Sequence, residues 1–170
     1  SAITVPPLDN SAMDGYAVCV ADVAQAGVKL PLSQRILAGT VGQPLQPGTA
    51  ARIFTGAPVP PGADAVLMQE DCATDGEGVV INKLPRPGEN IRRAGEDIAA
   101  GTQILAAGTR IGAAEMGLAA SVGLAKLPVT KRLKVACFFT GDELVSPGTV
   151  LQPGQIYNSN RYTLTGLLNG

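Results

Sequence analysis

The chain has 170 residues, of which 45% are hydrophobic and only 4% are aromatic. This length suits one domain or two small ones, and the apolar content excludes an intrinsically disordered chain. The net charge of −1, from 13 basic and 14 acidic residues, argues against a general nucleic-acid-binding protein, for which a basic excess is typical.

The sequence contains three widely spaced cysteines and no histidine. Cys19, Cys72 and Cys137 form no CxxC pair, which favours a reduced, cytoplasmic setting. Without histidine, the chain lacks the commonest zinc ligand and the base of Ser–His and Cys–His nucleophiles. A bound metal should therefore be a hard, oxygen-bound cation such as Mg²⁺. No apolar run approaches the roughly 20 residues that span a bilayer, so we expect no membrane association.

The segment from Leu8 to Val18 places a polar loop before an expected strand at 16–18. Within the loop, Asp14 precedes Gly15, and this dipeptide is common in turns. A carboxylate beside a glycine also suits a site that a ligand approaches closely. The same device recurs beside other apolar runs, at residues 55–56, 95–97 and 140–143.

Residues from about 5 to 95 are predicted to be rich in strands and turns. Strands are expected at 50–54, 65–68 and 78–81, and Asp75-Gly76 indicates a hairpin turn between the last two of these strands. Five Pro-Gly dipeptides, typical of type II turns, leave little room for long helices.

The pattern changes after residue 100. Two short apolar pieces, 103–105 and 109–111, predict a small hairpin around Ala107-Gly108. A helix is expected over 113–122, with Met116 on its apolar face and Gly123 as its C-terminal stop.

The last forty residues resemble the start of an α/β domain. The near-continuous apolar run 133–139 predicts a strand that is buried on both faces, as in parallel sheets. A helix over 161–168 should follow, with Asn158, Ser159 or Asn160 as its N-cap. Its free backbone N–H groups would suit an anion or phosphate. The chain lacks an initial Met and ends within this helix, so we expect it to be an excerpt of a longer protein.

Acidic and basic residues in the glycine loops are the candidates for chemistry. Loop carboxylates can bind Mg²⁺ or orient a water, or they are simply solvated turn residues. The pair Arg92-Arg93 suits phosphate binding, although ion pairs with Glu96 and Asp97 would use the same groups. The segment 55–58 is either an anion-binding nest or a cap at a strand end.

Four motifs in these loops resemble one known family. They are Asn10-Ser11-Ala12-Met13-Asp14-Gly15-Tyr16-Ala17, Thr55-Gly56-Ala57-Pro58 with 61–66, residues 88–93 with Gly95-Glu96-Asp97-Ile98, and Thr140-Gly141-Asp142-Glu143-Leu144. Together they are similar in order and spacing to the MoeA family of molybdopterin molybdenumtransferases, which includes the gephyrin E domain. A single motif would be weak evidence, but four in order make the resemblance specific.

The resemblance implies a mixed α/β, multidomain fold. Residues 1–98 would form a β-rich lateral domain, residues 99–130 a segment of a connecting domain, and residues 131–170 the truncated start of a molybdopterin-binding α/β domain. The implied assembly is an elongated homodimer whose cleft lies between the α/β domain of one subunit and the β-rich domain of the other.

The implied activity is molybdenum cofactor biosynthesis. Members insert molybdate into adenylated molybdopterin and release AMP with the help of a divalent cation, here expected to be Mg²⁺. A molybdopterin adenylyltransferase and molybdoenzymes are further implied partners. The later motifs of the α/β domain are not in this sequence, so we expect the piece alone to be inactive.

Site residues are assigned from the matching motif positions. The resemblance implies catalytic roles for Asp14, Thr55, Asp97 and Glu143. The candidate metal ligands are Asp97, Asp142 and Glu143. The same loops and the last helix supply the candidate substrate-binding residues: Asn10, Ser11, Gly56, Arg92, Arg93, Thr140, Gly141 and Asn160.

Two other hypotheses remain open from the sequence. The first is a non-catalytic scaffold or interaction module on the same fold. The second is an unrelated β-rich domain with solvated turn acids, which predicts that Asp14, Thr55, Asp97 and Glu143 point to separate regions of the surface.

Overall fold

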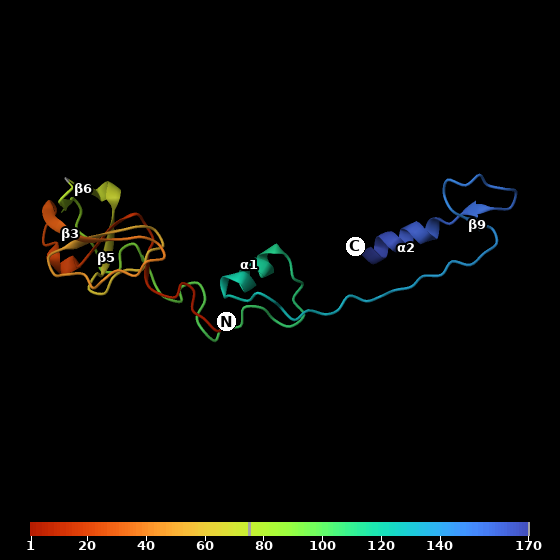
Figure 1. Cartoon of the computed structure of the whole chain (residues 1–170), viewed down its shortest axis with the longest axis horizontal. Helices are drawn as coiled ribbons and strands as arrows, with labels where there is room; N and C mark the ends of the chain where they lie inside the picture. Colours follow the sequence, from red (N-terminus) through yellow and green to blue (C-terminus); the bar gives the residue numbers. More distant parts are fainter. Residues whose placement is uncertain (75, 170) are drawn as a thin grey trace. The chain divides into compact units, whose positions relative to one another are not determined.

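A computed structural model describes residues 1–74 and 76–169 (Figure 1). The chain divides into two compact units, Ser1–Leu127 and Pro128–Gly170, which are called the first and second unit below. The elements of the first unit are β1 (Asn10–Ser11), β2 (Gly15–Val18), η1 (Val20–Asp22), β3 (Val28–Ile36), β4 (Ala50–Ile53), β5 (Ala65–Met68), η2 (Gln69–Asp71), β6 (Cys72–Thr74), β7 (Gly78–Ile81), β8 (Ile91–Arg92) and α1 (Ala113–Ser121). The second unit holds β9 (Leu144–Val145), β10 (Ile156–Tyr157) and α2 (Ser159–Asn169).

The main sheet of the first unit has the strand order β5-β2-β4-β3-β7-β6. The pair β3–β4 is parallel and the other four pairs are antiparallel. The strands predicted around residues 16–18, 50–54, 65–68 and 78–81 are all present. The hairpin expected between 65–68 and 78–81 is wrong, because β5 pairs with β2 and not with β7. The short strand β6, which the sequence did not reveal, takes that place beside β7, with Thr74 opposite Val79. Asp75 of the expected turn lies outside the described residues.

Strand β3 was missed by the sequence analysis. Pro31 lies in its middle, and proline cannot donate a hydrogen bond to a neighbouring strand. The structure accommodates Pro31 because β3 changes partner there: Val28 to Pro31 pair with β7, and Leu32 onward pairs with β4. The strand thus joins the two halves of the sheet.

The core of the first unit consists of two clusters that use alternate residues of the same strands. Tyr16, Val18 and Leu67 belong to one cluster, and Ala17 and Val66 to the other. Because successive side chains of a strand point to opposite faces, both faces of the sheet are buried near its centre.

Helix α1 forms where it was predicted. Glu115 accepts a hydrogen bond from the Gly112 N–H at its start (2.8 Å), and Gly123 follows its end with a φ of +79°. The expected apolar face is only partly correct, because Ala119 is buried while Met116 is 59% exposed. The hairpin predicted over 103–111 is wrong: these residues contain a turn but no strand. An isolated pair of three-residue strands would have too few hydrogen bonds to be stable.

The second unit contains local structure but no buried core among residues 128–169. The Asn158 side chain caps α2 by accepting a hydrogen bond from the Arg161 N–H (3.1 Å), so Asn158 is the N-cap among the three candidates. Two-residue strands β9 and β10 pair in parallel. The strand predicted at 133–139 is wrong, since this run has no strand partner among the described residues and Leu133 is 90% exposed.

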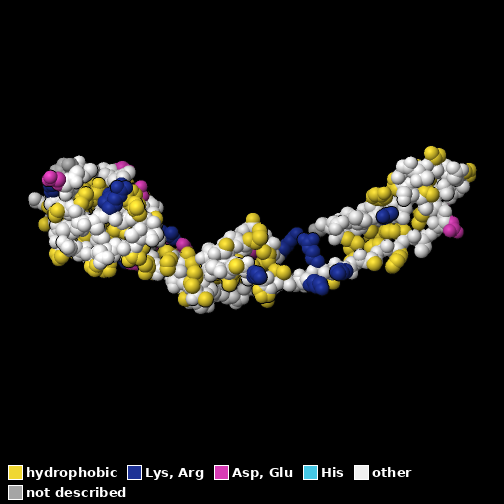
Figure 2. All heavy atoms as spheres, in the orientation of Figure 1, with side chains coloured by type: hydrophobic (Ala, Val, Ile, Leu, Met, Phe, Trp, Pro, Cys, Tyr) yellow, Lys and Arg dark blue, Asp and Glu magenta, His cyan; other side chains and the backbone are white. Residues whose placement is uncertain are grey.

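The extended run nevertheless keeps the alternation of a strand. Leu133, Val135, Cys137 and Phe139 line an open pocket together with residues of α2. Hydrophobic side chains remain visible on the surface of this unit (Figure 2). Within the described residues, no helix is long and apolar enough to cross a membrane.

Candidate functional site

Three of the four sequence motifs meet in the first unit. The backbone of the segment 10–12 forms the junction: Ser11 N–H donates to Ala57 O (2.9 Å), and Ala12 N–H donates to Asn90 O (2.9 Å). In the opposite direction, Gly56 N–H donates to Ser11 O (2.8 Å). The loops that contain Asp14, Thr55 and Arg92 are therefore neighbours, although 41 residues separate Asp14 from Thr55.

Asp14 and Thr55 form a direct pair. One carboxylate oxygen of Asp14 accepts hydrogen bonds from both the backbone N–H and the hydroxyl of Thr55, each at 2.8 Å. These two bonds, the backbone one first, lower the pKa of Asp14 below 3.8, and the nearby Arg52 charge adds to the effect. Asp14 is thus held as a carboxylate, and its second oxygen makes no hydrogen bond to the described residues.

The Thr55-Gly56 segment is a cap and not an open anion nest. Thr55 donates its N–H to Asp14, Gly56 to Ser11, and Ala57 to Phe54 O (2.9 Å). An anion would therefore have to displace existing acceptors from these three amides. Gly56 has a φ of +81°, so the glycine is needed for the turn itself.

Ser11 and Asn10 were predicted to bind substrate, but neither side chain is exposed as a ligand contact would be. Ser11 is 1% exposed, and its hydroxyl donates to Met13 O (2.6 Å), which holds the loop that leads to Asp14. Asn10 has a buried side-chain oxygen without a hydrogen-bond partner in the described structure. Ser11 is therefore a positioning residue in this structure.

Arg92 forms ion pairs with Glu96 and Asp97, as one of the two interpretations of the sequence predicted, whereas Arg93 pairs with Asp9 instead. Arg92 contacts both carboxylate oxygens of Asp97 (2.6 and 2.7 Å), and this interaction raises the pKa of Arg92. Arg93 donates to Asp9 (2.6 Å). Asp9 also accepts the Ala94 N–H, which together with Arg93 lowers the pKa of Asp9. Sequence analysis did not identify Asp9, which fixes the loop before Asp97.

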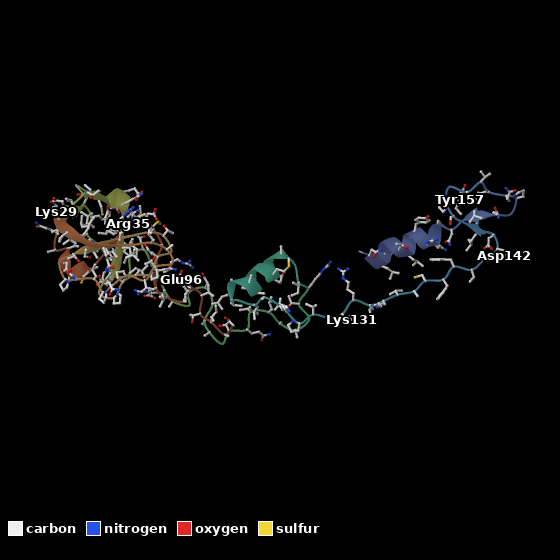
Figure 3. The ribbon with its side chains drawn as sticks, viewed as in Figure 1. Lys29, Arg35, Glu96, Lys131, Asp142 and Tyr157 are labelled. Carbon is white, nitrogen blue, oxygen red and sulfur yellow. The ribbon has the colours of Figure 1, made fainter. Side chains whose placement is uncertain are left out.

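The fourth motif lies in the second unit. Thr140 and Asn160 line an open pocket of about 280 Å³ beside the N-terminus of α2, together with Phe139, Leu144 and Asn158. Gly141, Asp142 and Glu143 form an exposed turn before β9, and Gly141 has a φ of +151°. Figure 3 labels Asp142 in this turn.

The three candidate metal ligands are divided between the units. Asp97 belongs to the first unit and is bonded to Arg92, whereas Asp142 and Glu143 belong to the second. Across residues 1–74 and 76–169, no group of three or more His, Cys, Asp or Glu side chains is arranged to hold a metal ion. A site that joins Asp97 to Glu143 stays a prediction.

Comparison with known proteins identifies the family. The family model described as "MoeA N-terminal region (domain I and II)" matches residues 1–123. Molybdopterin molybdenumtransferase 2 of Mycobacterium tuberculosis strain H37Rv is 52% identical over 169 residues, which cover 95% of this chain and 41% of that protein. The molybdopterin molybdenumtransferase of Haemophilus influenzae is 44% identical over 170 residues, covering 99% of this chain and 42% of that protein.

Solved structures give the same result. A molybdopterin biosynthesis MoeA protein from Pyrococcus horikoshii OT3 matches 99% of this chain with a TM-score of 0.90 and 32% identity, over 46% of its own length. The fold and the loops thus define a β-rich module similar to that of molybdopterin biosynthesis MoeA proteins. The chain belongs to the MoeA family and contains its N-terminal region. It spans about 41% of the length of the M. tuberculosis relative.

Proposed function

We propose that this chain is part of a molybdopterin molybdenumtransferase, which inserts molybdate into adenylated molybdopterin and releases AMP in molybdenum cofactor biosynthesis. The observation that carries the proposal is the meeting of three motifs around Ser11, with Asp14 bonded to Thr55 and Arg92 bonded to Asp97. An unrelated domain with scattered turn acids would have no reason to bring these loops together. The names of the relatives support the transfer of molybdenum to molybdopterin.

Within this function, each carboxylate has a role that its surroundings support. Asp14 is ionised and held by Thr55, so it is suited to orient a ligand group from the facing subunit of a homodimer. Asp97 and Glu143 would position the water or cation that acts on the adenylate phosphate. Arg92, already beside Asp97, can exchange this partner for a phosphate oxygen. Thr140 and Asn160, beside the α2 N-terminus, would contact the pterin-bearing ligand.

Mg²⁺ is the proposed cofactor. Magnesium is commonly held by one or two carboxylates, with waters and substrate phosphates completing its shell. The adjacent, exposed Asp142 and Glu143 fit this donor set, whereas Asp97 would first have to release Arg92. A bound Mg²⁺ would supply charge neutralisation at the adenylate phosphate. The proposed setting is the cytoplasm, which the three free cysteines support.

The proposal is tested on the full-length parent protein, purified without its cofactor. AMP release from adenylated molybdopterin is measured with magnesium, with and without molybdate. We expect molybdate-dependent release in the wild type and a reduction of tenfold or more, about 1.4 kcal/mol, in both Glu143→Gln and Asp97→Asn. Glu115→Gln is the matched control, because the new amide can still accept the Gly112 N–H at the start of α1.

Three outcomes separate the hypotheses. A wild type that binds no pterin and releases no AMP would contradict the transferase proposal and favour a scaffold on the same fold. An active wild type with two unaffected variants would keep the transferase and overturn the roles of Glu143 and Asp97. Equal losses in the control would show that the assay reports general damage to the fold.

A further inference from the structure

A row of three side chains crosses the main sheet beside the site described above. Tyr16 of β2 lies opposite Arg52 of β4, and Arg52 lies opposite Arg35 of β3. Phe54 follows two residues after Arg52 and therefore points to the same side of the chain. Figure 3 labels Arg35, and Figure 2 shows a patch of basic side chains at this position.

Both arginines converge on one aromatic ring. The guanidinium carbon of Arg35 lies 4.8 Å from the centroid of the Phe54 ring, and that of Arg52 lies 4.7 Å from it. Arg52 also lies 5.0 Å from the centroid of Tyr16. Such contacts hold a cation over the negative face of a ring. Both charges are therefore held against the same ring.

Among the described residues, no carboxylate lies within ion-pair distance of these two charges. Arg52 donates to neutral acceptors, Gly15 O (3.1 Å) and the side-chain oxygen of Gln69 (2.6 Å). Over residues 1–74 and 76–169, neither Arg35 nor Arg52 forms an ion pair. Like charges on adjacent strands repel each other, so the row is electrostatically unfavourable unless an anion joins it.

Asp14, Glu70 and Asp71 make hydrogen bonds to groups other than Arg35 and Arg52. Asp14 feels the charge of Arg52, but its hydrogen bonds go to Thr55. Glu70 accepts from Gln69 (3.1 Å), and Asp71 accepts from Lys83 (3.4 Å). The row therefore keeps a local positive excess in a chain whose net charge is −1.

Guanidinium groups match the geometry of tetrahedral oxyanions. Their planar forks donate pairs of parallel N–H bonds to phosphate-like oxygens. Arg35 is exposed, and its side chain makes no hydrogen bond within the described part of the chain, so its donors face solvent. Arg52 is half-buried, and its hydrogen bonds to Gly15 and Gln69 order its guanidinium before an anion binds.

We propose that Arg35 and Arg52, held over Phe54, form a binding site for a tetrahedral oxyanion, either free, such as phosphate or molybdate, or as the terminal phosphate of a nucleotide. This site lies beside Asp14 but is argued only from the arginine row. It therefore does not rest on the transferase reaction.

The test uses the whole 170-residue chain and nuclear magnetic resonance of the arginine side-chain Nε–H groups. Phosphate, molybdate and AMP are titrated separately at constant ionic strength, with chloride as the balancing anion. We expect saturable shifts of the Arg35 and Arg52 signals. The affinity should fall at least tenfold in Arg35→Gln and stay unchanged in Arg110→Gln, an exposed arginine of the same unit.

A second variant keeps the proposal testable if charge removal alters the fold. Phe54→Leu keeps both charges but removes the ring that orders them, so binding should weaken while the backbone spectrum stays dispersed. Binding of all three anions supports a general oxyanion site, and binding of AMP alone supports a nucleotide phosphate. Shifts that do not saturate, or that are equal in Arg35→Gln and Arg110→Gln, overturn the site. Preference for an acidic peptide over every oxyanion overturns it in favour of a protein partner.

Failure of this test is distinguishable from failure of the proposed function. The titration uses simple anions and needs no pterin, whereas the transferase assay follows AMP release by the full-length protein. A transferase that is active while Arg35 and Arg52 ignore all three anions would overturn this inference alone.

Discussion

The two units of the chain carry comparable family motifs but differ in how they are built. In the first unit, strands β2, β4 and β5 are buried on both faces by two clusters of side chains. In the second unit, no residue from 128 to 169 is buried. Sequence similarity to a family therefore extends further along this chain than a closed hydrophobic core does.

The difference follows from which structures can form locally. Helix α2 makes its hydrogen bonds within itself and is capped by Asn158, so it needs no distant partner. The run 133–139 has the composition of a buried strand, but a strand needs a neighbour for its backbone groups. The two units therefore differ in whether their side chains are buried, and not in whether they contain family motifs.

Matched leucine substitutions should show the largest contrast between the units. Leu67 is fully buried, and Leu67→Ala should destabilise the first unit by about 2–5 kcal/mol because it removes packed methyl groups and leaves a cavity. Leu133 is 90% exposed, so Leu133→Ala should change stability by less than about 0.5 kcal/mol. Urea unfolding followed by circular dichroism measures both. Comparable losses would mean that the second unit has a core of its own.

Two glycine-to-alanine substitutions within the first unit should change its stability in opposite directions. A Cβ at Gly15 would lie 1.8 Å from Leu67 O, a backbone atom that cannot move aside easily, so Gly15→Ala should cost about 1–3 kcal/mol. A Cβ at Gly117 in α1 would meet nothing within 4 Å, and Gly117→Ala should stabilise the helix by about 0.5–1 kcal/mol. Thermal unfolding of both variants is the measurement. A stable Gly15→Ala protein would contradict the close approach of β2 to β5.

Helix α2 should depend on its cap without affecting the first unit. Asn158→Ala removes the acceptor for the Arg161 N–H and should destabilise the helix by about 1 kcal/mol. Asn160→Ala, inside the first turn, is the control and should change little. The helical signal in circular dichroism and the urea midpoint of the first unit are recorded together. A shift of that midpoint in Asn158→Ala would show that the units are energetically coupled.

Low pH should lower the stability of the first unit, because carboxylates in its loops become protonated. The pKa of Asp14 is lowered from 3.8 by the hydrogen bonds from Thr55, and the pKa of Asp9 is lowered by Ala94 and Arg93. Each lowered pKa contributes stability that is complete above the usual pKa and disappears as the pH falls through the folded value. Urea midpoints measured between pH 6 and pH 2.5 should fall below about pH 4. Asp14→Asn should flatten this dependence in part, and an unchanged slope would mean that the Thr55 bonds do not persist in solution.

Local sequence signals predicted much of the first unit. Short, mostly apolar runs located β2, β4, β5 and β7, and Gly123 marked the end of α1. Pro31 concealed β3, because a change of strand partner in mid-strand depends on tertiary pairing and leaves no local signal. The hairpin at 103–111 and the strand at 133–139 were wrong for the same reason: both needed neighbours that the pattern could not supply.

The candidate site was predictable in its residues but not in its bonds. The motifs identified Asp14 and Thr55 separately, and only the structure shows that they are hydrogen-bonded to each other. Asp9 was missed, although a carboxylate close to the first motif was available as a signal. The grouping of Arg35 with Arg52 depends on the register of β3, the strand that the sequence did not reveal.

The pairing of Val5 with Ile98 has a consequence for how this module could be inherited. Val5 N–H donates to Ile98 O (2.8 Å), and Ile98 N–H donates to Val5 O (3.0 Å). The segment between these two residues, which contains the whole six-stranded sheet, therefore begins and ends at the same place in the structure. Domains whose ends lie side by side tolerate insertion and circular permutation. The sheet can therefore lengthen, shorten or be exchanged during evolution while the flanking chain keeps its path.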